Sequence, residues 1–439
     1  MSYKTPGVYV EEIAKFPPSV AQVETAIPAF IGYTADGPKN EPTRISSMLE
    51  YEAIFGKAKA ESFTVSVSGD SDTGYSASAV VAPNNFKMYY AMQMYFANGG
   101  GPCYIVSVGD LVKGYPSSVD PDDLEDGLNT LEREDEPTLI VFPDAEALGN
   151  GAYRLYEKAL DQAELMKDRF VIMDVVGNVD EFKDTTGPSV GPSGERLKYG
   201  AVYYPRLETV LSYNYDASTV HGVDLAALKI SNSELYNKVK KAIESTPVVL
   251  APSSAMAGVY AKVDSTSGVF KAPANVGLSY VVAPTVKISH EEQMEYNVNA
   301  TGRSINAIRS FTGKGTLVWG ARTLDGNSNE WRYISVRRFF NMVEESVKKA
   351  TERFVFEANT ANTWIRVQTM IENFLNQQWQ DGALAGSKPE EAYYVSVGLN
   401  KTMSAQDILE GRMIIEIGMA AVRPAEFIVL RFSHKLQEA

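Results

Sequence analysis

The stretch TLIVFPDAEALGNGAYRLYEKALDQAELMKDRFVIMDVV (residues 138–176) decides the fold class. It opens with an apolar run over residues 138–142 that predicts a buried strand, and a second such run follows over residues 170–176. Between them, apolar residues recur at helical spacing over residues 151–166 and predict an amphipathic helix. A strand, a helix and a second strand in this order are typical of a covered, mostly parallel sheet.

The same alternation extends on both sides of this stretch. The other predicted elements of the first 330 residues are a hairpin or surface loop at 62–82, strands at 26–33, 103–108, 201–204 and 248–251, and helices at 84–98, 121–133 and 231–244. In the last third we expect long helices at 334–351 and 362–380, strands at 392–397 and 413–420, and a short helix capped by Ser404. The predicted fold class is therefore α/β, of the mixed α+β kind.

Both ends of the chain read as extended segments. Residues 6–13 are β-branched and aromatic with little helical character, and residues 426–432 form an extended apolar run. Neither segment has a hydrophobic face large enough to stand alone, so each is expected to need a partner sheet. Pairing within the same chain is the alternative to pairing with another chain.

Composition limits the class of protein. The chain has 439 residues, which predicts two or three domains, and its formal net charge of −14 argues against nucleic acid as a partner. It has one cysteine, so an intramolecular disulfide cannot form, and folding in a reducing cytoplasm is the simplest expectation. We find neither a signal peptide nor an apolar stretch of membrane-spanning length, so direct membrane insertion is not expected.

Several short patterns resemble catalytic or metal sites and fail on inspection. Residues 187–191 match the G-x-S-x-G motif around Ser189, but no apolar strand precedes it, as a nucleophile elbow requires. The Gly313–Thr316 segment lacks the spacing of a phosphate loop, and the acidic residues after Asp120 lack the glycine of a calcium loop. Cys103 lies in a predicted buried strand, which favours an inert core thiol. No catalytic, cofactor-binding or metal-binding residues are predicted.

A set of motifs along the chain resembles a known family. These motifs lie at both ends of the chain and over most of its second half: TPGVYVEE (5–12), AFIGYTADGP (29–38), APSSAMAGVYAKVDSTSGVFKAPAN (251–275), SINAIRSFTGKGTLVWGARTL (304–324), EWRYISVRRFFNMVEESV (330–347), FVFEANTANTWIRV (354–367), GALAGSKPEEAYYVSV (382–397) and VRPAEFIVLRF (422–432). Together they resemble the contractile tail sheath proteins of phages, tailocins and extracellular injection particles. Residues 60–80 and 109–200 match no pattern of that family.

The resemblance implies a structural subunit rather than an enzyme. Such subunits form hexameric rings that stack helically around an inner tube, and the sheath contracts without nucleotide. The implied partners are further copies of the chain, the inner tube protein, and baseplate and cap proteins; no cofactor is expected. The particle would assemble in the bacterial cytoplasm and then form part of a virion or a released tail-like particle.

The resemblance also implies where contacts lie. Terminal arms of the family pair with sheets of neighbouring subunits, and the residues expected to do so here are Val8, Tyr9, Val10, Glu11, Ile13, Phe427, Ile428, Val429 and Leu430. Basic residues of the helix at 334–351 are expected to contact an acidic tube, namely Arg337, Arg338, Lys348 and Lys349; a solvated helix face is the alternative. The expected domains are an N-terminal arm (1–25), a first core segment (26–110), a variable outer domain (111–245), a middle segment (246–330), a tube-facing domain (331–424) and a C-terminal arm (425–439).

Two functions of other kinds remain as alternatives. An α/β serine hydrolase would use Ser189 as its nucleophile, and substitution of this serine by alanine combined with an esterase assay would distinguish it. A non-contractile tail protein such as a tube subunit is the second alternative, which the length of the chain disfavours.

Overall fold

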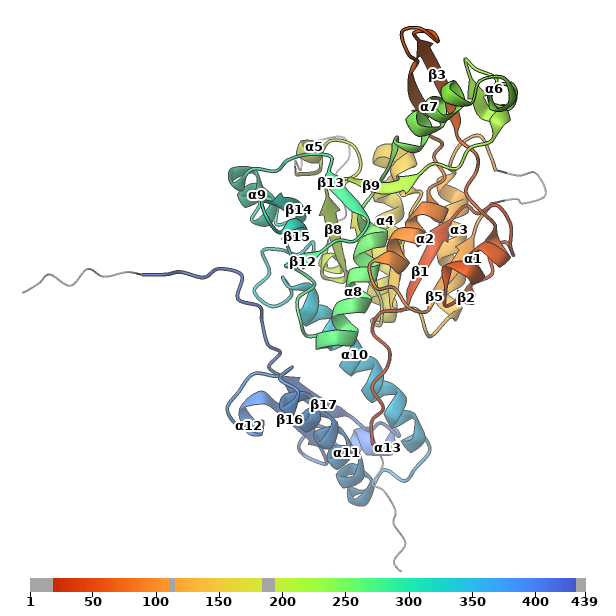
Figure 1. Cartoon of the computed structure of the whole chain (residues 1–439). Helices are drawn as coiled ribbons and strands as arrows, with labels where there is room; N and C mark the ends of the chain where they lie inside the picture. Colours follow the sequence, from red (N-terminus) through yellow and green to blue (C-terminus); the bar gives the residue numbers. More distant parts are fainter. Residues whose placement is uncertain (1–18, 110–114, 184–193, 432–439) are drawn as a thin grey trace, which may run out of the picture. The chain divides into compact units, whose positions relative to one another are not determined.

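The computed structural model describes residues 19–109, 115–183 and 194–431, and it forms two compact units (Figure 1). The main unit comprises Glu24–Glu344 together with Arg423–Ala439. The C-terminal unit comprises Glu345–Val422 together with Met1–Val23. The predicted arms within residues 1–18 and 432–439, including Val8, Tyr9, Val10, Glu11 and Ile13, lie outside the described residues.

A nine-stranded sheet organises the described part of the main unit, in the order β12-β15-β14-β8-β7-β6-β1-β5-β2. Its strands are β1 (Pro28–Gly32), β2 (Thr43–Ile45), β5 (Cys103–Ser107), β6 (Leu139–Val141), β7 (Phe170–Asp174), β8 (Gly200–Tyr204), β12 (Val276–Gly277), β14 (Ile305–Phe311) and β15 (Gly315–Val318). The six from β14 to β5 run parallel, and β2, β15 and β12 add antiparallel edges. This arrangement confirms the predicted α/β class.

Side chains alternate between the two faces of this sheet, so each face has its own core. Ile31 and Val106 belong to the core that contains residues of α3 (Pro121–Thr130) and α4 (Ala152–Met166). Phe30 and Ile105 belong to the core on the other side, formed with α1 (Met48–Phe55), α2 (Met88–Ala97) and α8 (Ser253–Ser267). Because helices cover both faces, the central strands are apolar throughout and not alternating. Strands from residues 26–110, 111–245 and 246–330 lie in this one sheet, so these three predicted segments belong to one compact unit.

Two smaller sheets extend the main unit. The predicted hairpin is β3 (Ser62–Ser68) with β4 (Ser76–Ala82); β3 also pairs with β10 (Val220–His221), and α6 (Leu225–Ser231) and α7 (Ser233–Glu244) lie beside it (Figure 1). The second sheet is antiparallel and consists of β11 (Pro247–Leu250), β9 (Leu207–Ser212) and β13 (Val281–Pro284). The strand expected at 248–251 therefore does not join the parallel sheet; only Val248 and Leu250 are buried in it, the pattern of a half-covered antiparallel strand. The remaining α-helices of this unit are α5 (Val179–Lys183) and α9 (His290–Asn297).

The C-terminal unit is built around one long helix and one short sheet. Helix α10 (Ile334–Thr351) begins in the main unit and ends here, and α11 (Ala361–Gln380) follows it. The buried face of α11 includes Val367, Ile371 and Leu375, and it packs against β16 (Tyr393–Val397). Helices α12 (Pro389–Ala392) and α13 (Ala405–Leu409) and strand β17 (Ile415–Met419) complete the unit, and Ser404 caps α13 as predicted.

Candidate assembly surfaces

Strands β16 and β17 form an antiparallel two-stranded sheet, in register from Tyr393 opposite Met419 to Val397 opposite Ile415. Within the described residues, no third strand pairs with either one over this register. A two-stranded sheet is marginal by itself and presents a row of backbone donors and acceptors on each outer edge. This sheet is therefore a template to which a further extended segment can add.

The surface of this small sheet is organised by one tyrosine. The Tyr394 ring lies over Gly418, where an added Cβ would come within 2.1 Å of the ring. Its hydroxyl donates to Glu416 Oε1 at 2.7 Å, and this hydrogen bond raises the pKa of Tyr394. The cross-strand contact fixes the register of the two strands and leaves their edges open.

The apolar run Phe427, Ile428, Val429 and Leu430 lies on the surface of the chain. Its four side chains are between 69% and 80% exposed, and the structure assigns them to no strand. Four consecutive large apolar residues at this exposure are unusual for a soluble monomer and are typical of a contact surface. The run thus has the composition of a strand and has no partner strand among the described residues, and its predicted role in intersubunit pairing stays a prediction.

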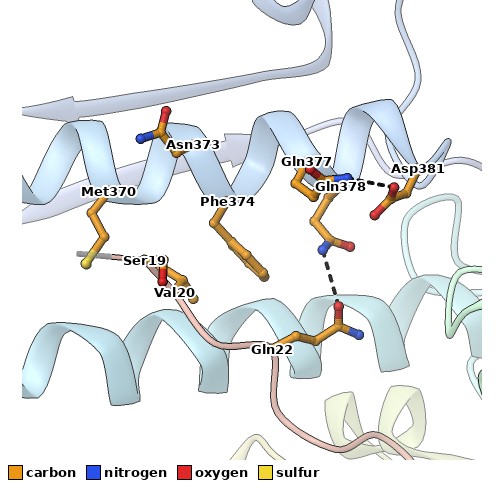
Figure 2. Close-up of a pocket in the computed structure, with 9 residues that line it drawn as sticks. All are labelled: Ser19, Val20, Gln22, Met370, Asn373, Phe374, Gln377, Gln378 and Asp381. Carbon is orange, nitrogen blue, oxygen red and sulfur yellow. Dashed lines mark hydrogen bonds between the residues drawn. The ribbon is translucent and has the colours of Figure 1, made fainter. Parts of the chain in front are cut away.

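The described root of the N-terminal arm is seated on the C-terminal unit. Ser19, Val20 and Gln22 line a groove of about 420 Å³ whose other wall is α11, with Met370 and Phe374 projecting toward them (Figure 2). Gln378 Nε2 donates to Gln22 Oε1 at 3.4 Å. Further backbone contacts of this segment are the donation from Val23 N to Ser346 Oγ (3.0 Å) and from Arg353 to the carbonyl of Ser19 (3.2 Å).

Two of the four predicted tube-contact residues are buried inside the chain. Arg337 and Arg338 are each 3% exposed, which corrects the expectation of an exposed basic face at these positions. Arg337 stacks on Trp331 at 4.3 Å from the ring centroid and pairs with Glu344 at 2.9 Å. Arg338 forms an ion pair with Asp264 at 2.5 Å. The physical reason is that both guanidinium groups are satisfied by aromatic and acidic partners of the main unit, close in sequence for Arg337 and distant in sequence for Arg338.

The other two predicted tube contacts are at the surface. The Lys348 side chain is 61% exposed and that of Lys349 is 37% exposed, and both pair with the nearly buried Glu345, at 3.0 and 3.6 Å. The two lysines lie in the last turn of α10, where positive charge is favourable. Their contact with a tube stays a prediction.

The patterns that resemble enzyme sites have structural roles where they are described. The Gly313–Thr316 segment makes the turn between β14 and β15, with Gly313 and Gly315 at positive φ. Asp120 caps α3, and burial raises the pKa of the Cys103 thiol. Ser189 lies outside the described residues. The described ranges hold no group of three or more metal-ligating side chains, and none of their helices is long and apolar enough to span a membrane.

Sequence reasoning missed three residues that form ion pairs between distant parts of the chain. Arg322, Glu426 and Asp264 take part in buried ion pairs with partners 104 and 74 positions away. No local pattern predicts such pairs, although a glutamate directly before an apolar run, as at Glu426, is a signal that could have been noticed.

Comparison with known proteins identifies the architecture. Residues 327–435 match the family model described as the phage tail sheath C-terminal domain. The tail sheath protein of Enterobacteria phage T4 is 22% identical over 162 residues, which is 37% of this chain and 23% of the length of that protein.

Solved structures of injection systems match nearly the whole chain. The sheath complex of the PVC extracellular contractile injection system, in the contracted state, is 31% identical with 99% of each chain covered and a TM-score of 0.67. The contracted helical sheath of the anti-feeding prophage is 34% identical, and a chain of its baseplate is 35% identical. Each covers 99% of this chain and 100% of its own, with a TM-score of 0.68.

Sheath-system chains at more than 30% identity thus match this chain along nearly its full length. The chain belongs to the contractile tail sheath family and is a structural subunit of the sheath of a phage tail or injection system, not an enzyme.

Proposed function

We propose that this subunit assembles as hexameric rings, which stack helically around an inner tube, and that contraction of the sheath drives the tube into a target envelope. The observation that supports this most directly is the presence, in one chain, of an open two-stranded sheet and an exposed apolar run. Strand addition would join them between copies through main-chain hydrogen bonds.

Pairing of this kind has a consequence for symmetry. The donor run and the acceptor sheet are different surfaces, so the contact is head-to-tail and need not close between two copies. Head-to-tail contacts generate rings or helices, whereas a self-complementary contact would stop at a dimer. The arms, Val8 to Ile13 at one end and Phe427 to Leu430 at the other, would keep neighbouring copies connected while the units move as rigid bodies.

We further propose that contraction proceeds without nucleotide hydrolysis. The proposal agrees with the role of the segment that most resembles a phosphate loop, which is a tight hairpin turn between β14 and β15. The proposed partners are the inner tube protein, the baseplate and a cap protein, with Lys348 and Lys349 facing the tube. The particle would assemble in the cytoplasm before its release.

Deletion of residues 1–13 tests the role of the arms. We expect a folded protein with an unchanged circular dichroism spectrum that forms no sheath in negative-stain electron microscopy. The full-length chain, prepared in parallel, provides the control for assembly conditions. Normal helical tubes from the truncated chain would contradict the proposal.

A further inference from the structure

The chain passes between its two units at three places: between Val23 and Glu24, between Glu344 and Glu345, and between Val422 and Arg423. The second passage lies inside the continuous helix α10. The first and third are not helical, and each belongs to the root of a terminal arm. On the main-unit side, each of these two roots meets a buried arginine.

At the C-terminal root the buried arginine is Arg322, whose side chain is 4% exposed. Its Nε and Nη2 donate to the two carboxylate oxygens of Glu426 at 2.9 and 2.7 Å, while Nη1 donates to the carbonyls of Asn297 and Gly326. The Glu426 carboxylate also accepts from Asn297 Nδ2 at 2.7 Å and from the Tyr333 hydroxyl at 3.1 Å. Three side chains thus hold the residue directly before the apolar run.

The electrostatics of Glu426 agree with this arrangement. Burial alone would raise the pKa of its carboxyl group, but the hydrogen bonds from Arg322 and Asn297 outweigh burial and lower it. Glu426 is therefore ionised at neutral pH, and a bidentate pair with a planar guanidinium fixes direction as well as distance.

At the N-terminal root the buried arginine is Arg338. It forms a bidentate pair with Asp264, at 3.0 and 2.5 Å, and lies over the Tyr260 ring at 4.6 Å from its centroid. Arg338 Nη2 also donates to the carbonyl of Thr25 at 3.0 Å, and the Thr25 hydroxyl donates to Asp264 Oδ2 at 2.5 Å. Both the backbone and the side chain of the last residue of the predicted N-terminal arm are therefore held.

We infer that Arg322 and Arg338 are positioning residues that anchor the two terminal arms at fixed points of the main unit. Each anchor fixes the point on the main unit at which its arm begins. An arm bound to a neighbouring copy would therefore transmit force to the core of the main unit without detaching the first residues of the arm. This role rests on the proposed function of the arms, whereas the anchoring itself is a property of the single chain.

Spin-label distance measurements on the single chain test the C-terminal anchor. The one cysteine, Cys103, is fully buried, so labels can be placed at L165C on α4 and V429C in the apolar run, sites that are 74% and 75% exposed. The Leu165–Val429 pair should give one narrow distance distribution. E426Q, which removes the charge and keeps the shape, should lose the narrow peak while the chain stays folded. E330Q, at an exposed glutamate, is the matched control and should keep it.

The N-terminal anchor is tested in the same way with D264N and labels at L165C and E24C. Where E426Q or D264N fails to fold, R322K and R338K replace them, since lysine keeps the positive charge but cannot form the bidentate hydrogen bonds of a guanidinium group. A narrow peak that persists in all of these variants would overturn the inference.

Sheath formation by the same variants separates the anchor from the proposed function. Loss of the narrow peak together with loss of sheaths supports both. Loss of the peak with normal sheaths would show that the two arginines hold the arms in the single chain, and would overturn their mechanical role in the sheath. If the wild-type chain forms no sheath but keeps its narrow peak, the proposed function fails and the anchor stands.

Discussion

Replacing Ile428 and Leu430 with serine should abolish sheath formation while leaving the subunit folded. In an extended segment, side chains two positions apart share a face, so these two residues would enter the same neighbouring surface. They are 80% and 72% exposed in the single chain, so their removal costs the fold little. Full burial contributes about 1.5–3 kcal/mol for a side chain of this type, so the double variant loses roughly 3–6 kcal/mol for each arm that pairs.

This loss translates into a measurable concentration. Each 1.4 kcal/mol corresponds to about a tenfold change in an equilibrium constant, so the subunit concentration needed for assembly should rise by about 100-fold or more. Pelleting of sheaths over a concentration series, checked by negative-stain microscopy, measures it. The matched control is V80S with I230S, which removes two apolar side chains of similar exposure (69% and 90%) from the main unit. A variant that assembles at the wild-type concentration would refute the role of the apolar run.

Three further predictions follow from the described contacts. Burial raises the pKa of Asp174 to about 7, well above the ordinary value for an aspartate, so between the two values the folded state keeps a proton that the unfolded state releases. The free energy of unfolding should therefore fall by up to about 4 kcal/mol as pH rises from ~4 to ~7. D174N should lose this pH dependence in denaturant unfolding, and wild-type and D174N stabilities that change in parallel with pH would contradict the prediction. The double variant K348E/K349E should reduce co-sedimentation of sheaths with tubes, and an unchanged amount of co-sedimented sheath would contradict the proposed tube contact. G258A should lower the melting temperature, because the added Cβ would lie 2.5 Å from the backbone of α2 and force α8 away at a cost of about 1–3 kcal/mol; an unchanged melting temperature would show that the two helices separate freely.

The sequence was sufficient for the elements whose pattern is local. The apolar runs over 103–108, 138–142 and 170–176 contribute the parallel strands β5, β6 and β7 to one sheet, with β1 between β5 and β6. A run that is apolar at every position is stable only where both of its faces are covered. Helix α10 has the predicted bounds, since its apolar stripe is long and regular. The cap at Ser404 was also predictable, because capping depends on residues only three positions apart.

Features set by distant residues could not be predicted. Helix α8 was missed because eight of its residues from Ser253 to Tyr260 are buried, so it lacks the polar face that marks an amphipathic helix. Arg338 seemed to belong to a basic surface because its acidic partner Asp264 is 74 positions away in the sequence. Arg337 has nearby partners in Trp331 and Glu344, but no local pattern shows that these contacts bury it. The open edges of β16 and β17 likewise depend on which strands reach them, which no local pattern records.

A cryo-EM reconstruction of the assembled sheath is the most direct measurement of whether the arms join neighbouring copies. We predict that the sheet of β16 and β17 gains at least one strand contributed by residues 427–430 or 8–13 of an adjacent subunit. A sheath in which this sheet stays two-stranded, with both arms of every subunit lying on their own chain, would contradict it.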